Sequence, residues 1–128
     1  MTVTFDTYRE QQLNWLKQEV NIEEFRCAAA KIVVIHMPII KDKNNWYGMA
    51  QLAQHYGPVL HNAGIDLMIC RHMHNNLWIG TEKSGFNYPV IVCSNEDFME
   101  VKLDSRRLNF KIRGKESQLV YYQSMVLE

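Results

Sequence analysis

The sequence predicts an α/β domain in which a βαβ unit is followed by an antiparallel β meander. Continuous apolar runs at residues 31–40 and 65–70 are typical of strands buried on both faces. Apolar residues between the two runs recur at helical spacing, so the two strands should run parallel. Beyond residue 77, apolar and polar residues alternate, which is typical of antiparallel strands with one wet face.

A helix should precede the first strand. Thr7 and Glu10 have the spacing of a capping box, which favours a helix start at this point. Leu13, Leu16 and Val20 then recur on one face, among polar neighbours. The pattern therefore predicts an amphipathic helix in the first twenty residues.

The segment between the two apolar runs is expected to form two helical pieces. Trp46, Met49 and Tyr56 share a helical face, which indicates packing in the core or in an interface. Pro58 can open a second, shorter helix, and Gly64 is placed to end it as a left-handed cap.

The second half of the chain should hold the meander. Its period-two segments end at turn residues, as strands do. The expected strands are 77–79, 89–92, 98–104, 108–112 and 119–127.

Composition limits the class of protein. A chain of 128 residues with no linker is expected to be a single domain spanning residues 1–128. The formal net charge of +0 argues against a nucleic-acid-binding surface. No apolar run is long enough to span a membrane, and the first residues do not have the pattern of a signal peptide. A cytoplasmic location is the default expectation.

Three histidines are placed where a ligand site is expected. His36 ends the first buried strand, and His72 and His74 follow the second. In open α/β sheets, ligands bind beyond the carboxyl ends of the strands, and imidazole is a good ligand for Zn, Ni, Cu and Fe. These residues therefore predict a metal site, although a histidine at a strand end is often only a hydrogen-bonded structural residue. His55 and His61 are interpreted as partly exposed surface residues.

The cysteines give no motif of their own. Cys27, Cys70 and Cys93 are far apart and form no CxxC pair, which indicates reduced and mostly buried thiols. Cys70 alternates with His72 and His74 and could join them as a ligand. A buried strand residue is the simpler interpretation.

At this point the residues resemble the calcineurin-like metallophosphoesterases. Ile35-His36-Met37-Pro38 is similar to the His-x-Pro motif that ends a strand in that family. Residues 70–74, with His72 and His74, are similar to the later Gly-His-x-His motif, and the preceding run 63–67 is also typical. The helix at residues 8–17 is similar too. The resemblance covers about residues 5 to 104.

The resemblance implies a fold and a chemistry. The fold is an α/β/β/α sandwich, of which this chain would be the C-terminal half. In the family, two divalent metal ions (Mn, Fe or Zn) activate a water that attacks the phosphorus of a phosphoester substrate. By resemblance, His36 and His72 would ligate one metal and His74 the other.

The chain also departs from the family pattern. It has no Asp-x-His and no Gly-Asn-His motif, and Asp6 and Asp42 stand in the wrong order to replace them. Arg71 occupies the position of the motif glycine, where its charge could disfavour a cation or bind an anion. The expectation is therefore the C-terminal portion of a metal-dependent phosphoesterase, with no catalytic residue assigned, inactive or very weak alone, with metal absent or weakly bound.

Two other functions are alternatives to this one. A truncated paralogue could act as a non-catalytic binding or dimerisation module. Nucleotide binding by a Rossmann-type domain is disfavoured, because no GxGxxG or GxxxxGK[ST] loop occurs. A half-domain should also leave apolar sheet surface and strand edges uncovered. The expected partner is a second copy in a homodimer, or a protein that supplies the missing half.

Overall fold

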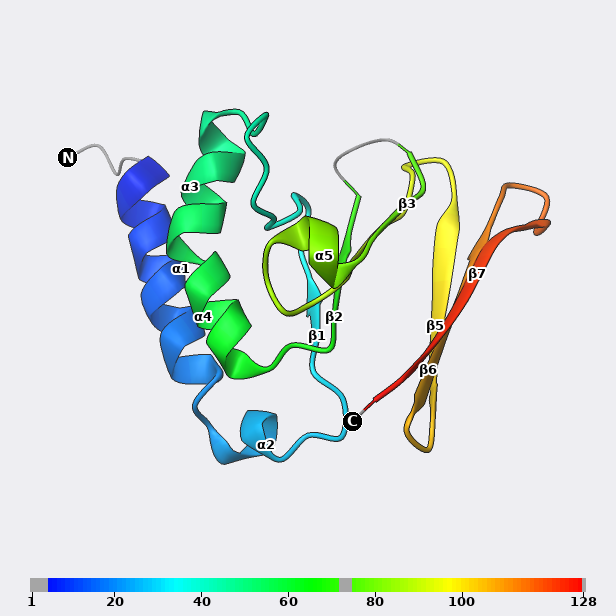
Figure 1. Ribbon diagram of the computed structural model, residues 1–128, viewed down its shortest axis with the longest axis horizontal. Coiled ribbons are helices and arrows are strands. Elements are labelled where there is room, and N and C mark those ends of the chain that lie inside the picture. The colour runs from blue at the N-terminus through cyan, green and yellow to red at the C-terminus, as the bar shows by residue number, and fades with distance from the viewer. Residues whose placement is uncertain (1–4, 72–74, 128) are drawn as a thin grey trace.

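The computed structural model describes residues 5–71 and 75–127, and it shows a mixed α/β fold with two β-sheets (Figure 1). In these residues the helices are Phe5–Glu19 (α1), Glu23–Arg26 (α2), Tyr47–His55 (α3), Gly57–Ala63 (α4) and Thr81–Ser84 (α5). The strands are Ile32–Val34 (β1), Leu67–Cys70 (β2), Leu77–Ile79 (β3), Val90–Val92 (β4), Phe98–Asp104 (β5), Arg107–Arg113 (β6) and Leu119–Val126 (β7).

The first sheet, here sheet A, has the strand order β1-β2-β4-β3. β1 and β2 are parallel, with Val33 opposite Met68, so the predicted βαβ unit is confirmed. β4 is also parallel to β2, and β3 is antiparallel to β4. The prediction that 77–79 and 89–92 belong to the meander is therefore wrong. β4 is buried at every residue, and such short apolar strands carry no signal for the neighbour they pair with.

The second sheet, here sheet B, is the predicted antiparallel meander, with the order β5-β6-β7. β5 and β6 are joined by a tight turn in which Ser105 has a φ of 58°. The ladder between β6 and β7 has an irregularity between Ile112 and Arg113. The three predicted strands of this sheet are confirmed.

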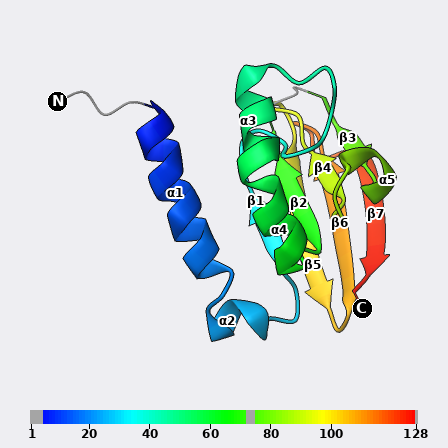
Figure 2. The same ribbon diagram turned by 60° about the vertical axis from the view of Figure 1, so that its left-hand side comes forward.

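Sheet A lies between a layer of helices and sheet B (Figure 1). Alternate residues of β2 pack against the helices on one face and against sheet B on the other. Met68 and Cys70 pack in the cluster formed with the helices, and Leu67 and Ile69 pack in the cluster formed with sheet B. The prediction that residues 65–70 form a strand covered on both faces is confirmed for β2. In Figure 2, α1 lies at one side of the molecule and β7 at the other.

The first apolar run gives a different strand from the one expected. Only Ile32–Val34 of residues 31–40 forms β1, and this strand is an edge of sheet A in the described residues. Val33 packs towards the helices, but Ile32 is exposed and Val34 is 77% exposed. The prediction of burial on both faces is wrong for β1, because sheet B does not extend over this edge. An apolar run does not reveal whether its strand is central or outer.

The start of the first helix also differs from expectation. The predicted helix is present as α1, but Thr7 lies inside it and cannot be its N-cap residue. The predicted start of the second short helix is confirmed, because Pro58 lies in the first turn of α4. Gly64 ends α4 in the left-handed region, with a φ of 73°.

Packing of the predicted helical face is confirmed in part. Met49 and Tyr56 are buried against the core, as expected. Trp46 is 51% exposed at the N-cap of α3, so it does not pack in the core, and its packing in an interface stays a prediction. None of the helices in the described part of the chain combines the length and apolar character needed to cross a bilayer.

Candidate functional site

The carboxyl ends of β1 and β2 meet at one edge of sheet A. The backbone N–H of Arg71 donates a hydrogen bond to the carbonyl oxygen of His36 at 3.1 Å. One residue earlier on the first strand, the N–H of Ile35 donates to Ile69 O at 3.0 Å. The exposed His36 therefore lies beside the residue that immediately precedes 72–74. His72 and His74 themselves lie outside the described residues, so the three-histidine site stays a prediction.

A shallow pocket of about 380 Å³ opens at this edge. It is lined by residues from four segments, including His36, Arg71, Cys93 and Phe98. In open α/β sheets this end of parallel strands is where ligands bind. The pocket is therefore the candidate functional site of the chain.

The Arg71 side chain is held by the loop between β4 and β5. Its Nη2 donates to the carbonyl oxygens of Ser94 and Asp97, each at 2.9 Å. A guanidinium keeps its positive charge at any physiological pH, so these bonds fix one positive charge beside His36. The two carbonyl oxygens occupy part of the donor capacity of the guanidinium.

The carboxylate of Asp97 lies in the same loop and is fixed by side-chain hydrogen bonds. Its Oδ2 accepts hydrogen bonds from Asn76 Nδ2 at 2.7 Å and from Ser94 Oγ at 2.9 Å. These bonds stabilise the carboxylate form, so the Asn76 bond first and the Ser94 bond second lower the pKa of Asp97 below its ordinary value. Arg71 adds a smaller attraction. The carboxylate thus links β3 to the loop that holds Arg71.

The stability of this loop should depend on pH in the acid range. A carboxyl group with a lowered pKa stabilises the fold above its unfolded pKa, and this stabilisation is lost as the pH falls through the folded pKa. We expect the chain to be more stable than Asp97→Asn above about pH 5, where the unfolded carboxyl is ionised. The difference should shrink as the pH falls below 3.8, the ordinary value. Urea unfolding at several pH values measures the difference in free energy of unfolding between the chain and Asp97→Asn.

The matched control for this prediction removes the main donor to the carboxylate. In an Asn76→Ala background, Asp97→Asn should change the pH dependence less, because the pKa of Asp97 is then closer to its ordinary value. An unfolding difference that stays constant down to pH 2 would contradict the prediction.

The two buried cysteines are protonated thiols that pack inside the fold. Burial raises the pKa of Cys70 to about 12 and also raises the pKa of Cys93. Their thiols face backbone carbonyls, Cys70 that of Ile91 and Cys93 that of Asp97. The interpretation of Cys70 as a buried strand residue is therefore confirmed. Cys27 is exposed, so burial of the thiols holds for two of the three.

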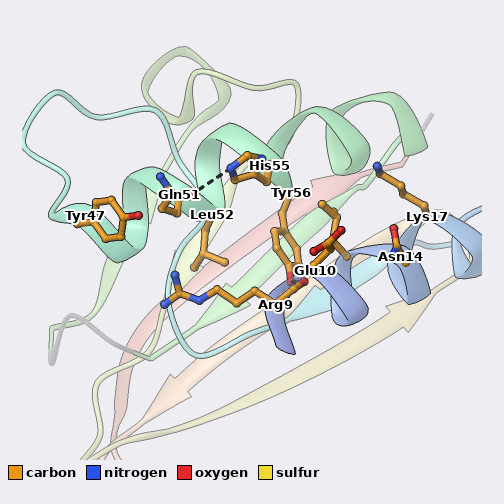
Figure 3. Close-up of a pocket in the computed structure, with 10 residues that line it drawn as sticks. Arg9, Glu10, Asn14, Lys17, Tyr47, Gln51, Leu52, His55 and Tyr56 are labelled. Carbon is orange, nitrogen blue, oxygen red and sulfur yellow. Dashed lines mark hydrogen bonds between the residues drawn. The ribbon is translucent and has the colours of Figure 1, made fainter. Parts of the chain in front are cut away.

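A second groove, of about 400 Å³, lies between α1 and α3 (Figure 3). The Tyr56 hydroxyl crosses it and donates to the carbonyl oxygen of Arg9 at 2.7 Å. His55 and Gln51 pair with each other at 3.2 Å on its outer wall. The hydrogen bonds formed in this groove join α1 to α3 through Tyr56, or join neighbours within α3. We interpret this groove as a packing contact between α1 and α3 rather than a ligand-binding site.

The structure separates the remaining histidines from the candidate site. His55 and His61 are exposed, as predicted, and His61 Nδ1 accepts a hydrogen bond from the backbone of Asn87 at 3.2 Å. Sequence reasoning missed Ser94 and Asp97, which accept from Arg71, and Asn76, which bonds to both of them. The polar run 94–97 between two apolar strands marks a loop, but nothing in the sequence connects that loop to residue 71.

Comparisons with known proteins identify the fold. No protein-family model matches the sequence, and no curated protein matches it either. Among solved structures, the chain is similar to GAP50, the anchor in the inner membrane complex of Plasmodium, with a TM-score of 0.68 and 19% identity. The match covers 97% of this chain and 44% of GAP50, so the chain spans less than half the length of that protein. At this identity the similarity shows a shared fold.

Proposed function

We propose that this chain is the C-terminal portion of a metal-dependent phosphoesterase domain of the calcineurin-like type. The observation that carries the proposal is the 3.1 Å bond between Arg71 N and His36 O. It brings together the two strand ends that resemble the family's His-x-Pro and Gly-His-x-His motifs. The similarity to 44% of a longer fold supports a part-domain. The proposal includes the expectation that the whole domain is an α/β/β/α sandwich, to which this chain contributes one half.

The donor groups decide how many metals the chain could hold. The proposed ligands His36, His72 and His74 are imidazoles, which suit a borderline divalent metal such as Zn²⁺. Among the described residues, no three His, Cys, Asp or Glu side chains form a metal-binding group. Asp97 Oδ2 already accepts hydrogen bonds from Asn76 and Ser94, so Asp97 is not assigned as a bridging carboxylate. The residues fit one weakly held metal and do not fit a dinuclear pair.

A metal bound there would polarise a phosphoester oxygen and lower the pKa of a bound water. The chain's own contribution is a fixed positive charge: Arg71, held by two carbonyl oxygens, can attract the phosphate group of a substrate. Without the ligands that the family draws from its other half, the chain alone is proposed to be inactive. Steady hydrolysis of p-nitrophenyl phosphate with added Mn²⁺ or Zn²⁺, abolished by His72→Ala, would show that it is active.

Metal binding is the direct test of the proposed site. Titration calorimetry with Zn²⁺ is expected to show one site, and His36→Ala should weaken binding on the order of tenfold or more, because one of three ligands is lost. His72→Ala and His74→Ala should do the same. His55→Ala is the matched control, since His55 lies on α3 and pairs with Gln51. Equal Zn²⁺ affinity in the chain and all three variants would refute the site.

The alternative function is a non-catalytic binding or dimerisation module. The observation that favours it is the exposed apolar edge of β1, where Val34 is 77% exposed. An anchoring role, such as the one named for GAP50, belongs to this class. The two functions differ in the zinc titration: a binding module has no reason to lose metal affinity when His36 is replaced.

A further inference from the structure

β5 is an outer strand of sheet B. It pairs with β6 on one side, and within the described residues no strand pairs with its other side. Six of its seven residues are exposed. The free side of such a strand presents a row of unpaired backbone N–H and C=O groups, which is a template for pairing with another strand.

The apolar face of sheet B also extends to this edge. Val101 lies opposite Phe110 and Leu103 lies opposite Leu108, so each pair shares one face of the sheet. Phe110 and Leu108 are fully buried, whereas Val101 is 39% exposed and Leu103 is 45% exposed. The inner face of the sandwich therefore reaches solvent at β5.

The edge of sheet A is open at the same place. Val34 of β1 lines the same pocket as Phe98 and Met99 of β5, so the outer strands of the two sheets lie near each other. All three belong to segments that are largely exposed. The sandwich is thus open along one side, with apolar side chains on both outer strands, β1 and β5.

The sequence of β5 is complementary to itself. Antiparallel pairing of two copies about Val101 places Glu100 opposite Lys102 twice, on the outer face. The same register places Met99 opposite Leu103 twice on the inner face, and Phe98 opposite Asp104 at the two ends of the pairing. Directly opposed side chains of opposite charge stabilise a pair of strands, and like charges destabilise it.

Other registers lose this match. Pairing centred on Glu100 or on Lys102 places two like charges opposite each other, and a shift by one residue puts both Glu100 and Lys102 opposite apolar side chains. β7, the other outer strand of sheet B, contains no charged residue, so nothing in its sequence selects a register. Charge and apolar pattern together select one arrangement of β5.

We propose that β5 is a dimerisation edge, at which it pairs antiparallel with β5 of a second copy and Val101 lies on the two-fold axis. A two-fold contact of this kind uses the same patch on both subunits. Sheet B then continues across the dimer as a six-stranded sheet, and the open sides of the two sandwiches face each other. This proposal is independent of the proposed metal site.

Glu100 is available for this contact. Its Oε1 accepts from Arg113 Nε at 3.2 Å, and its side chain remains 56% exposed. The second carboxylate oxygen is therefore free to accept from the partner's Lys102. Arg113 stands on the same outer face, so Glu100 would join two positive charges within one sheet.

Charge reversal tests the register. The chain should sediment at about twice its 15.1 kDa mass at tens of micromolar. Glu100→Lys places lysine opposite lysine, and Lys102→Glu places glutamate opposite glutamate, so each variant alone should dimerise at least about tenfold more weakly. An equimolar mixture of the two variants restores opposite charges at both positions and should form a heterodimer. Native mass spectrometry resolves that species.

Two further variants make the test specific. The double variant with Glu100→Lys and Lys102→Glu should dimerise like the original chain, which shows that neither substitution prevents folding. Glu116→Lys, in the exposed turn after β6, makes the same charge change away from β5 and should leave the dimer unchanged. A monomer at high micromolar concentration would overturn the proposal and indicate that the edge charges keep copies apart. A dimer insensitive to both single variants, or a mixture that stays monomeric, would also overturn it.

Discussion

Phe110→Ala is expected to lower the free energy of unfolding by about 3–5 kcal/mol, the largest stability change predicted here. Phe110 is fully buried between the two sheets. Its ring stacks on Trp78 of β3, with 5.7 Å between the centroids. Alanine would leave a cavity at the contact that joins sheet B to sheet A. Urea unfolding at one fixed protein concentration measures the change, because association shifts apparent stability.

The control for Phe110→Ala lies in the same sheet. Leu119 of β7 is exposed, so Leu119→Ala should change the free energy of unfolding by less than about 1 kcal/mol. Similar losses in both variants would show that the stability of the chain does not depend on the packing between its sheets.

Tyr88→Phe is expected to lower the free energy of unfolding by about 1–3 kcal/mol. The Tyr88 hydroxyl donates to the carbonyl oxygen of Ile39 at 2.7 Å, and both residues are buried. Burial raises the pKa of Tyr88, so the hydroxyl stays protonated and remains a donor. Phenylalanine keeps the ring but leaves the carbonyl without this partner. Thermal or urea unfolding, followed by circular dichroism, measures the loss.

A second tyrosine provides the matched control. The Tyr122 hydroxyl donates to Asn109 Oδ1 at 3.1 Å, but this bond is exposed to water. Tyr122→Phe should therefore have an effect within about 0.5 kcal/mol, since water replaces the lost partner. If both tyrosine variants lost the same stability, burial of the Tyr88 bond could not be the reason.

The sequence predicted the elements better than their partners. Apolar pattern found β2, the short helix ended by Gly64, and the three strands of sheet B. It did not find that β4 pairs with β2 rather than with the meander, because strands of three apolar residues are compatible with several neighbours. The apolar pattern also predicted that both faces of β1 are buried. One face is exposed, because burial of that face depends on how far sheet B extends.

The candidate site was predictable where it depends on strand order alone. His36 and Arg71 end neighbouring parallel strands, so the βαβ pattern was sufficient to bring them together. The hydrogen bonds that fix the Arg71 side chain were not predictable. They depend on Ser94 and Asp97 in a loop that follows a different strand, and such contacts form only when the whole sheet is assembled.

The two sheets differ in the length of chain that each must close. In sheet B every strand pairs with the next one along the chain, as where Asp104 pairs with Arg107. In sheet A, pairing Ile32 with Leu67 first requires the intervening helices to be looped back. Loop-closure entropy grows with the length of the loop, so it favours formation of the meander before the parallel ladder. In a nascent chain β1 and β2 emerge before sheet B, so the ladder that closes the longer loop is encoded ahead of the ladder that loop-closure entropy favours.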